Sequence, residues 1–187
     1  MNKIWFSSDL HFNHDKEFIW KERGFNSVTE MNEAIVERFN STIDPEDTLY
    51  LLGDSMMGDL ETASVWFNKL TCKNIIMVYG NHDSNARIKF YANQPEKIKC
   101  LGWADVMTYK KKMFHLSHWP TAVINDSKFF WNLHGHTHST EKFNEIPCCY
   151  NVAVDAHNCY PVCLDTIIED IFKKINEEKE VKENETV

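Results

Sequence analysis

Residues 3–11 read Lys-Ile-Trp-Phe-Ser-Ser-Asp-Leu-His, an apolar run at 3–6 followed by Asp9 and His11. The run is short and has no regular polar alternation, which is typical of a strand covered on both faces. Asp9 and His11 are two positions apart, so on an extended segment their side chains point to the same side. The stretch therefore predicts a buried strand that ends in two side chains able to bind one ion together.

The same arrangement recurs along the chain. Apolar runs at 48–52, 74–79, 113–116 and 129–133 are each followed by a polar cluster: Gly53-Asp54, Gly80-Asn81-His82-Asp83, Ser117-His118 and His134-Gly135-His136-Thr137-His138. Ligands bind at the carboxyl ends of strands in α/β sheets, so we expect these loops to converge. The glycines before Asp54, Asn81 and His136 permit tight turns and close backbone approach.

Helical patterns lie between the apolar runs. Ser27-Val-Thr-Glu30 has the spacing of a capping box and opens a segment with one apolar face. Residues 59–70 form a second candidate helix, and a last one begins at Asp165 or Thr166. A further apolar run at 150–154 predicts another strand. Strands interleaved with helices favour an α/β domain.

The length of 187 residues fits one domain, which we place at 1–176. The residues after Asn176 are almost all charged or polar, which predicts a flexible tail over 177–187. No apolar stretch has the length of a membrane span or a secretory signal. We therefore expect no membrane partner, a cytoplasmic location and six reduced cysteines.

The net charge indicates which class of binding partner the protein can have. Lysine and arginine number 20 against 28 acidic residues, a net charge of −8. A protein that binds long nucleic acid usually carries a basic stripe, and the short run Lys110–Lys112 reads instead as a solvated face. A small phosphorylated substrate fits this charge better than long DNA or RNA. The sequence sets no oligomeric state.

The residue types of the clusters indicate a metal. Imidazole and carboxylate groups suit zinc, iron, manganese or nickel rather than calcium. No cysteine belongs to the set, which disfavours a structural zinc finger. Taken singly, Asp9, Asp54, Asn81 and Asp83 would be ordinary turn residues after strands. Together, the five clusters favour one metal site.

These clusters resemble the calcineurin-like metallophosphoesterase family. The pieces Asp-x-His, Gly-Asp, Gly-Asn-His-Asp, a single His and Gly-His-x-His follow in the family order between Asp9 and His138. The wording at 8–14, 151–155 and 160–162 is similar to that of its small bacterial and phage-encoded phosphoesterases. The resemblance implies a four-layer sandwich of two mixed β-sheets flanked by helices, with the site on strand-end loops at one edge.

The resemblance also implies a centre of two divalent transition-metal ions, with manganese favoured over iron, zinc or nickel. Its ligands would be Asp9, His11 and His138 for the first ion, Asn81, His118 and His136 for the second, and Asp54 bridging both, beside a bridging water or hydroxide. His82 would lie near the leaving group, where it would stabilise the transition state or protonate the departing oxygen, and Asp83 would orient His82. Substrate phosphate contacts are expected from Asn81, His14 and Arg87.

The expected function is therefore dinuclear hydrolysis of a phosphoester by the bridging hydroxide, on a small phosphodiester or nucleotide. A phosphomonoesterase, a nuclease and a non-catalytic interaction scaffold on the same fold remain alternatives. Several flanking residues also stay open. His14 and Arg87 could be surface residues, and Phe12, Trp119 and Trp131 could wall the pocket or belong to the core. The cysteines at 148, 149, 159 and 163 match no common zinc spacing and read as buried thiols.

Overall fold

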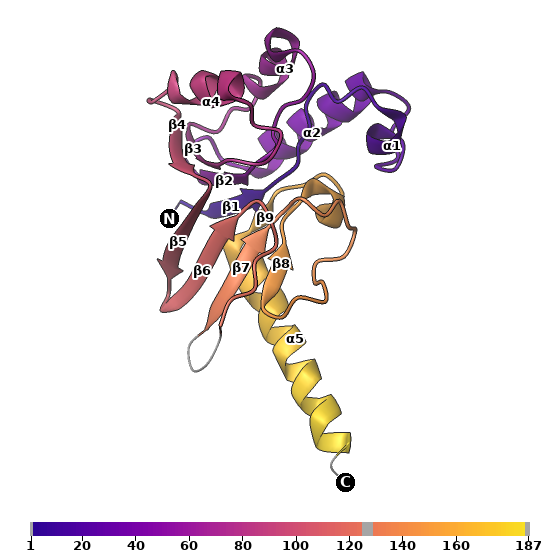
Figure 1. Ribbon diagram of the computed structural model, residues 1–187, viewed down its shortest axis with the longest axis vertical. Helices are drawn as coiled ribbons and strands as arrows, with labels where there is room; N and C mark the ends of the chain where they lie inside the picture. The colour runs from indigo at the N-terminus through magenta and orange to yellow at the C-terminus, as the bar shows by residue number, and fades with distance from the viewer. Residues whose placement is uncertain (1, 125–128, 186–187) are drawn as a thin grey trace.

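A computed structural model describes residues 2–124 and 129–185 (Figure 1). The strands of the described part form two sheets. The first has the order β4-β3-β2-β1-β9 and comprises β1 (Ile4–Ser7), β2 (Thr48–Leu52), β3 (Asn74–Val78), β4 (Ile98–Gly102) and β9 (Val162–Cys163). The second has the order β5-β6-β7-β8 and comprises β5 (Ala104–Tyr109), β6 (Lys112–Ser117), β7 (Phe130–His134) and β8 (Cys149–Asn151).

The helices flank these sheets. Figure 1 shows α1 (Glu17–Trp20), α2 (Val28–Thr42), α3 (Leu60–Phe67) and α4 (Asn85–Ala92) gathered on one side of the first sheet. A 3₁₀ turn, η1 (Val154–His157), precedes β9, and α5 (Leu164–Glu185) runs past the second sheet. As predicted, the Ser27 side chain caps α2 by accepting from the Glu30 N–H at 3.1 Å.

Strand direction decides where the polar loops end. Strands β1 to β4 run parallel, β9 is antiparallel to β1, and β6, β7 and β8 run parallel with β5 antiparallel to β6. Both sheets are therefore mixed, which confirms the predicted fold class. Because parallel strands end at the same edge, the loops after β1, β2 and β3 leave the first sheet together, and those after β6 and β7 leave the second together.

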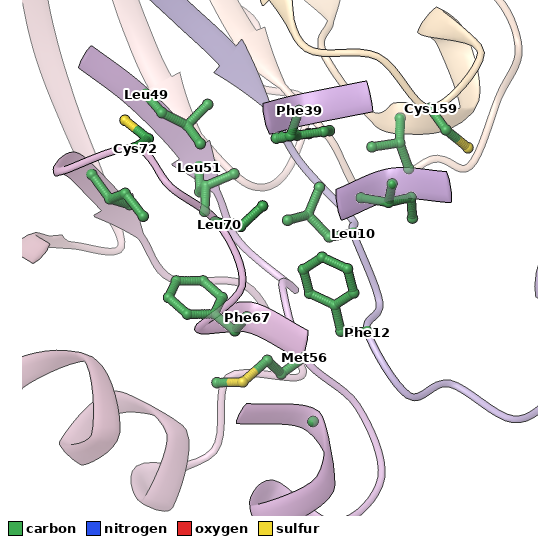
Figure 2. Packing of buried hydrophobic residues seen from close by; sticks show 14 of the residues in the cluster. Leu10, Phe12, Phe39, Leu49, Leu51, Met56, Phe67, Leu70, Cys72 and Cys159 are labelled. Carbon is green, nitrogen blue, oxygen red and sulfur yellow. The ribbon is translucent and has the colours of Figure 1, made fainter. Parts of the chain in front are cut away.

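Two buried apolar clusters hold the layers together. One packs the helices against the first sheet, and Figure 2 shows its centre, including Leu49 and Leu51 of β2, Phe39 of α2 and Phe67 of α3. The other joins the facing sides of both sheets with α5, whose Ile167 and Ile171 are fully buried in it. These clusters fix the relative positions of the two sheets and so of the two groups of loops.

The structure decides for two aromatic residues whether they wall the pocket or belong to the core. Phe12 is fully buried and belongs to the first cluster, and Trp131 belongs to the second. Both are core residues and do not wall a pocket.

The predicted strands and the three predicted helices are present, and further elements join them. Strands β4, β5 and β9 and helices α1 and α4 were not predicted. The charged segment from 177 also differs from expectation, because α5 continues through it to Glu185. Its side chains are exposed wherever they are described, so packing does not hold it, and its flexibility stays a prediction. Residues 186–187 of that tail lie outside the described residues.

Candidate metal centre and active site

The first predicted ligand group lies together at the carboxyl end of β1. Asp9 Oδ1 is 3.5 Å from His11 Nε2 and 3.8 Å from His138 Nε2. Asp9 and His11 are buried, yet Asp9 Oδ1 and both ring nitrogens of His11 have no hydrogen-bond partner. Unpaired buried polar atoms are costly, so native structures rarely keep them without a reason. A cation between these atoms would supply a partner for Asp9 Oδ1 and His11 Nε2, and this set of atoms therefore fits a metal ion.

The second predicted group lies beside it, where β3, β6 and β7 end. Asn81 Oδ1 is 3.0 Å from both His118 Nε2 and His136 Nδ1, and these two nitrogens are 3.3 Å apart. His118 Nδ1 lies 2.8 Å from the Leu52 carbonyl oxygen, which can only accept, so this nitrogen carries the proton. The Nε2 lone pair is thereby left facing the other two donors, as a metal ligand requires.

Asp54 lies between the two groups. Its Oδ2 is 3.2 Å from His118 Nε2, and carboxylate oxygens of Asp9 and Asp54 lie within 4.8 Å of one another and of the His118 nitrogen. All seven predicted ligands thus meet at one place, with Asp54 in the position expected of a shared ligand. Their binding of metal stays a prediction.

The electrostatics of the cluster favour charged carboxylates. Burial alone would raise the pKa of Asp9, but the adjacent imidazole of His11, with those of His118 and His138, holds it well below its usual range. Burial likewise opposes ionisation of Asp54, and the neighbouring His118 imidazole and the main-chain N–H of His82 lower the pKa of its carboxyl. Both groups are therefore ready to bind a cation at neutral pH.

The backbone at these positions is unusual. Five of the seven candidate ligands have left-handed φ values: Asp9 at 57°, His11 at 51°, Asp54 at 54°, His136 at 69° and His138 at 48°. Non-glycine residues rarely adopt this region, and it is found most often at functional sites. All five residues lie in the loops that follow β1, β2 and β7.

Two glycines permit the close approach of these loops. A Cβ added at Gly80 would lie 2.2 Å from Asp54 Oδ1, and one at Gly135 would lie 2.1 Å from Ser8 Oγ and 2.2 Å from Asp9 Oδ2. A side chain at either position would collide with a candidate ligand. The role predicted for these glycines therefore has a steric basis.

Comparisons with known proteins agree with this geometry. The family model for calcineurin-like phosphoesterases matches residues 2–182. The chain belongs to that family. It is accordingly a metallophosphoesterase, as the resemblance implied.

Two proteins similar to this phosphoesterase cover most of its chain. It is 31% identical over 180 residues to the uncharacterized protein MJ1445 of Methanocaldococcus jannaschii, with 92% of this chain and 93% of that protein covered. The protein of unknown function AQ665 from Aquifex aeolicus has the same fold, with a TM-score of 0.67, 23% identity and coverage of 90% of this chain and 99% of that one. Neither names a substrate.

Two positioning residues of the phosphoesterase escaped the sequence analysis. Asp155 Oδ2 lies 3.2 Å from His138 Nδ1, so it orients this candidate ligand. Arg23 holds the same carboxylate with two bonds of 2.9 Å and donates to the main-chain oxygen of Asp9 at 2.9 Å. Burial alone would raise the pKa of Asp155, but His138 and Arg23 lower it to about 2. This ion pair therefore connects η1 and the loop after α1 to Asp9 and His138 of the first ligand group.

His82 is at the site and accessible. Its main-chain N–H donates to Asp54 Oδ1 at 2.8 Å, and its ring Nε2 lies 4.0 Å from Asp54 Oδ2. The side chain is 44% exposed, unlike the buried ligands Asp9, Asp54 and His118. A substrate bound over the centre would therefore contact this ring, which is the position a proton donor needs.

The role predicted for Asp83 needs correction. Its carboxylate accepts from the N–H groups of Gly80 and Asp54, at 2.8 and 3.0 Å, and from the Tyr91 hydroxyl at 3.0 Å. The ring of His82 is not among these donors, although the two residues are adjacent in the chain. Asp83 therefore ties the loop after β2 to the loop after β3 instead of orienting His82.

Two other residues were expected to contact the substrate. His14 lies beside the site, whereas Arg87 donates hydrogen bonds to main-chain oxygens. The His14 ring lies 5.1 Å from that of His11, and burial with neighbouring imidazoles lowers its pKa to about 4. Arg87 donates to the carbonyl oxygens of His82 and Gly58, at 2.9 and 2.7 Å. This guanidinium braces two loops, and its contact with substrate stays a prediction.

His134 and the cysteines have structural positions and do not belong to the candidate ligand set. His134 is buried under the site, with its ring bonded to the Gly135 carbonyl and to Asn144. All six cysteines are free thiols. The metal-ligand groups found among residues 2–124 and 129–185 contain no cysteine.

A pocket of about 370 Å³ opens beside the first ligand group. His11, His82 and His138 form its inner side, and His14 and Asp155 also line it. On the opposite flank of the centre, the ring of Trp119 lies 5.3 Å from that of His118 and 6.0 Å from that of His136. Trp119 is 37% exposed, so it is the one aromatic residue of the three left open that reaches the site.

Proposed function

We propose that this metallophosphoesterase hydrolyses a small phosphodiester, such as a nucleotide, with two divalent transition-metal ions held by the seven candidate ligands. One observation carries the proposal: two groups of nitrogen and oxygen donors lie side by side with the Asp54 carboxylate between them. When bound, such ions neutralise phosphoryl oxygens and lower the pKa of a coordinated water.

The residues of the chain would divide the remaining work. Asp9, Asp54 and the imidazole nitrogens fix the position at which a phosphoryl group binds. His82 extends from the same centre into the pocket and is placed to give a proton to the departing oxygen. His14 lies in that pocket too and would contact the substrate.

Location and metal identity belong to the proposal as well. Free thiols suit the reducing cytoplasm, where we place the enzyme. None of the helices in the described ranges is long and apolar enough to cross a membrane. Manganese is our first choice among metals that accept nitrogen and oxygen ligands.

The test is reconstitution of metal-stripped protein with manganese, nickel or zinc. Turnover of bis-(p-nitrophenyl) phosphate is compared with that of p-nitrophenyl phosphate, and a preference for the diester supports the proposal. A preference for the monoester would favour a phosphomonoesterase. Absence of turnover with every metal would contradict hydrolysis and favour the scaffold alternative.

Two variants locate the chemistry. Asp54→Asn should lose both turnover and bound metal, whereas His82→Ala should lose about 100-fold or more in kcat while keeping its metal. Matched controls are Asp105→Asn on the exposed part of β5 and His115→Ala on β6, outside the site. Retention of full turnover by Asp54→Asn would contradict the proposed centre.

A further inference from the structure

The pocket beside the metal centre has a second wall that the proposed chemistry does not use. Besides the histidines and Asp155, its lining comes from Phe18, Ile19 and Glu22 in and after α1, and from Met57. Its volume of about 370 Å³ is in the range of pockets that hold small ligands. A phosphoryl group alone would occupy only the histidine side.

Phe18 is the most informative residue of this wall. Its side chain is 62% exposed, although it is a large apolar residue beside a candidate active site. Its ring meets that of His14 edge-on, with the centroids 5.8 Å apart, so it is held next to the histidine side of the pocket. An accessible ring in this position can stack on a flat ligand.

Glu22 gives the pocket a polar end. It makes no ion pair or hydrogen bond with any other described residue, and it lines the pocket along with Phe18. A free carboxylate repels phosphate but accepts hydrogen bonds from an amino group. The phosphoryl group would therefore lie at the histidine side and an amino-bearing group toward Glu22.

We infer that this pocket binds an aromatic arm of the substrate, a nucleobase, which stacks on Phe18 and points its amino group toward Glu22. The inference rests on the proposed function, because it assumes that the phosphoryl group lies at the metal centre. It makes α1 the element that selects the substrate. Since His82 lines the same pocket, the base belongs to the arm that leaves.

A second aromatic surface offers the rival position for the base. Trp119 and Trp103, whose rings lie 6.1 Å apart, flank the His118 and His136 side of the centre. Neither tryptophan lines the pocket of about 370 Å³. The enclosing pocket therefore favours Phe18, and Trp119→Ala becomes the variant that distinguishes the two surfaces.

The experiment measures binding to the manganese-loaded protein by calorimetry, with ligands that are not hydrolysed. These are the methylenephosphonate analogues of AMP and of ribose 5-phosphate, which differ only in the base. We expect the AMP analogue to bind about tenfold more tightly, the equivalent of about 1.4 kcal/mol. Phe18→Ala should bring the two affinities within about twofold. Phe172→Ala, an exposed phenylalanine on α5, should keep the tenfold difference.

The outcomes separate the inference from the function on which it rests. Equal affinities in the wild type, or a tenfold difference that survives in Phe18→Ala, would overturn the inference while leaving the phosphoesterase proposal intact. A difference lost only in Trp119→Ala would overturn it in favour of the tryptophan surface. If neither analogue nor inorganic phosphate binds the manganese-loaded protein, the proposed centre itself fails. Because Phe18 is exposed, loss of folding does not complicate the variant.

Discussion

A buried aspartate lies beside each end of β1, Asp47 from just before β2 and Asp9 from the loop after β1, and the two carboxylates are bonded in opposite ways. At the amino end, Asp47 accepts from the Lys3 N–H at 2.7 Å, the Trp5 ring N–H at 2.8 Å and the Asp44 N–H at 3.3 Å. Both of its oxygens are used. At the carboxyl end, Asp9 accepts from the His136 N–H at 2.8 Å through one oxygen, and the other oxygen has no partner.

This difference separates a structural carboxylate from a functional one. A buried carboxylate that accepts several hydrogen bonds stabilises the fold by itself. One that faces unpaired imidazole nitrogens gains a full set of partners only when a cation binds. Whether both carboxylate oxygens accept hydrogen bonds thus separates the two residues. We expect Asp47 to serve the stability of the fold and Asp9 to serve the reaction.

The largest effect is expected from Asp9→Asn. It removes a carboxylate from the candidate centre, and kcat/KM should fall about 1000-fold or more, since metal ions contribute several kcal/mol to catalysis. Metal-free Asp9→Asn should still fold, because the oxygen that is replaced accepts no hydrogen bond in the wild type. Assays of turnover and thermal unfolding on the same preparations check both statements. A fall in metal-free stability with turnover intact would reverse the assignment.

A smaller effect is expected from Asp155→Asn, which weakens the orientation of His138. Loss of such an outer partner typically reduces metal affinity by about 10–100-fold. Calorimetric metal titration should show one weakened binding step, that of the Asp9, His11 and His138 group. The surface variant Asp105→Asn serves as the control, and unchanged affinity in Asp155→Asn would show that the Arg23 pair has only a structural role.

Asp47→Asn should show the converse of Asp9→Asn. The amide nitrogen would face a backbone or indole N–H in place of an acceptor, so the free energy of unfolding should fall by about 1–3 kcal/mol. Turnover per folded molecule should stay at the wild-type value. Denaturant unfolding of the metal-free proteins measures the change, and a loss of metal binding would contradict the separation of the two ends.

The smallest effect is a pH dependence. Burial alone would raise the pKa of Asp47, but its hydrogen bonds with Trp5, Lys3 and Asp44 outweigh burial and lower it. A lowered folded pKa gives stability that is complete above the unfolded value of about 4 and is lost as pH falls below it. The unfolding free energy of metal-free wild type should therefore drop more steeply below about pH 4 than that of Asp47→Asn. Parallel curves would contradict the assignment.

The convergence of the candidate ligands could be expected from the sequence, because imidazole and carboxylate groups are common metal ligands. Asp54 and His118 follow apolar runs that could only be buried strands, and parallel strands bring their ends together. Arg23 could not be found this way, since it lies in a charged surface-like segment and acts only through Asp155. Asp155 itself stands in a stretch noted for its family resemblance, which was the one available signal.

The strand that was not predicted and the partner wrongly predicted for Asp83 also have physical explanations. Strand β5 is largely exposed and lies at the edge of its sheet, so it lacks the buried run by which other strands were recognised. Asp83 was paired with His82 because they are neighbours in the chain, but Tyr91, eight residues later, reaches its carboxylate from α4. Contacts between elements decide such partners, and the sequence does not display them.

The left-handed backbone at Asp9, His11, Asp54, His136 and His138 has a consequence for laboratory evolution. Each such residue costs of order 1–3 kcal/mol that glycine would not, although aspartate and histidine adopt the conformation more often than most residues. Selection for heat resistance alone should therefore accumulate glycine at these positions and yield robust proteins that no longer bind metal. Thermostable libraries of this chain should be screened for turnover from the first round.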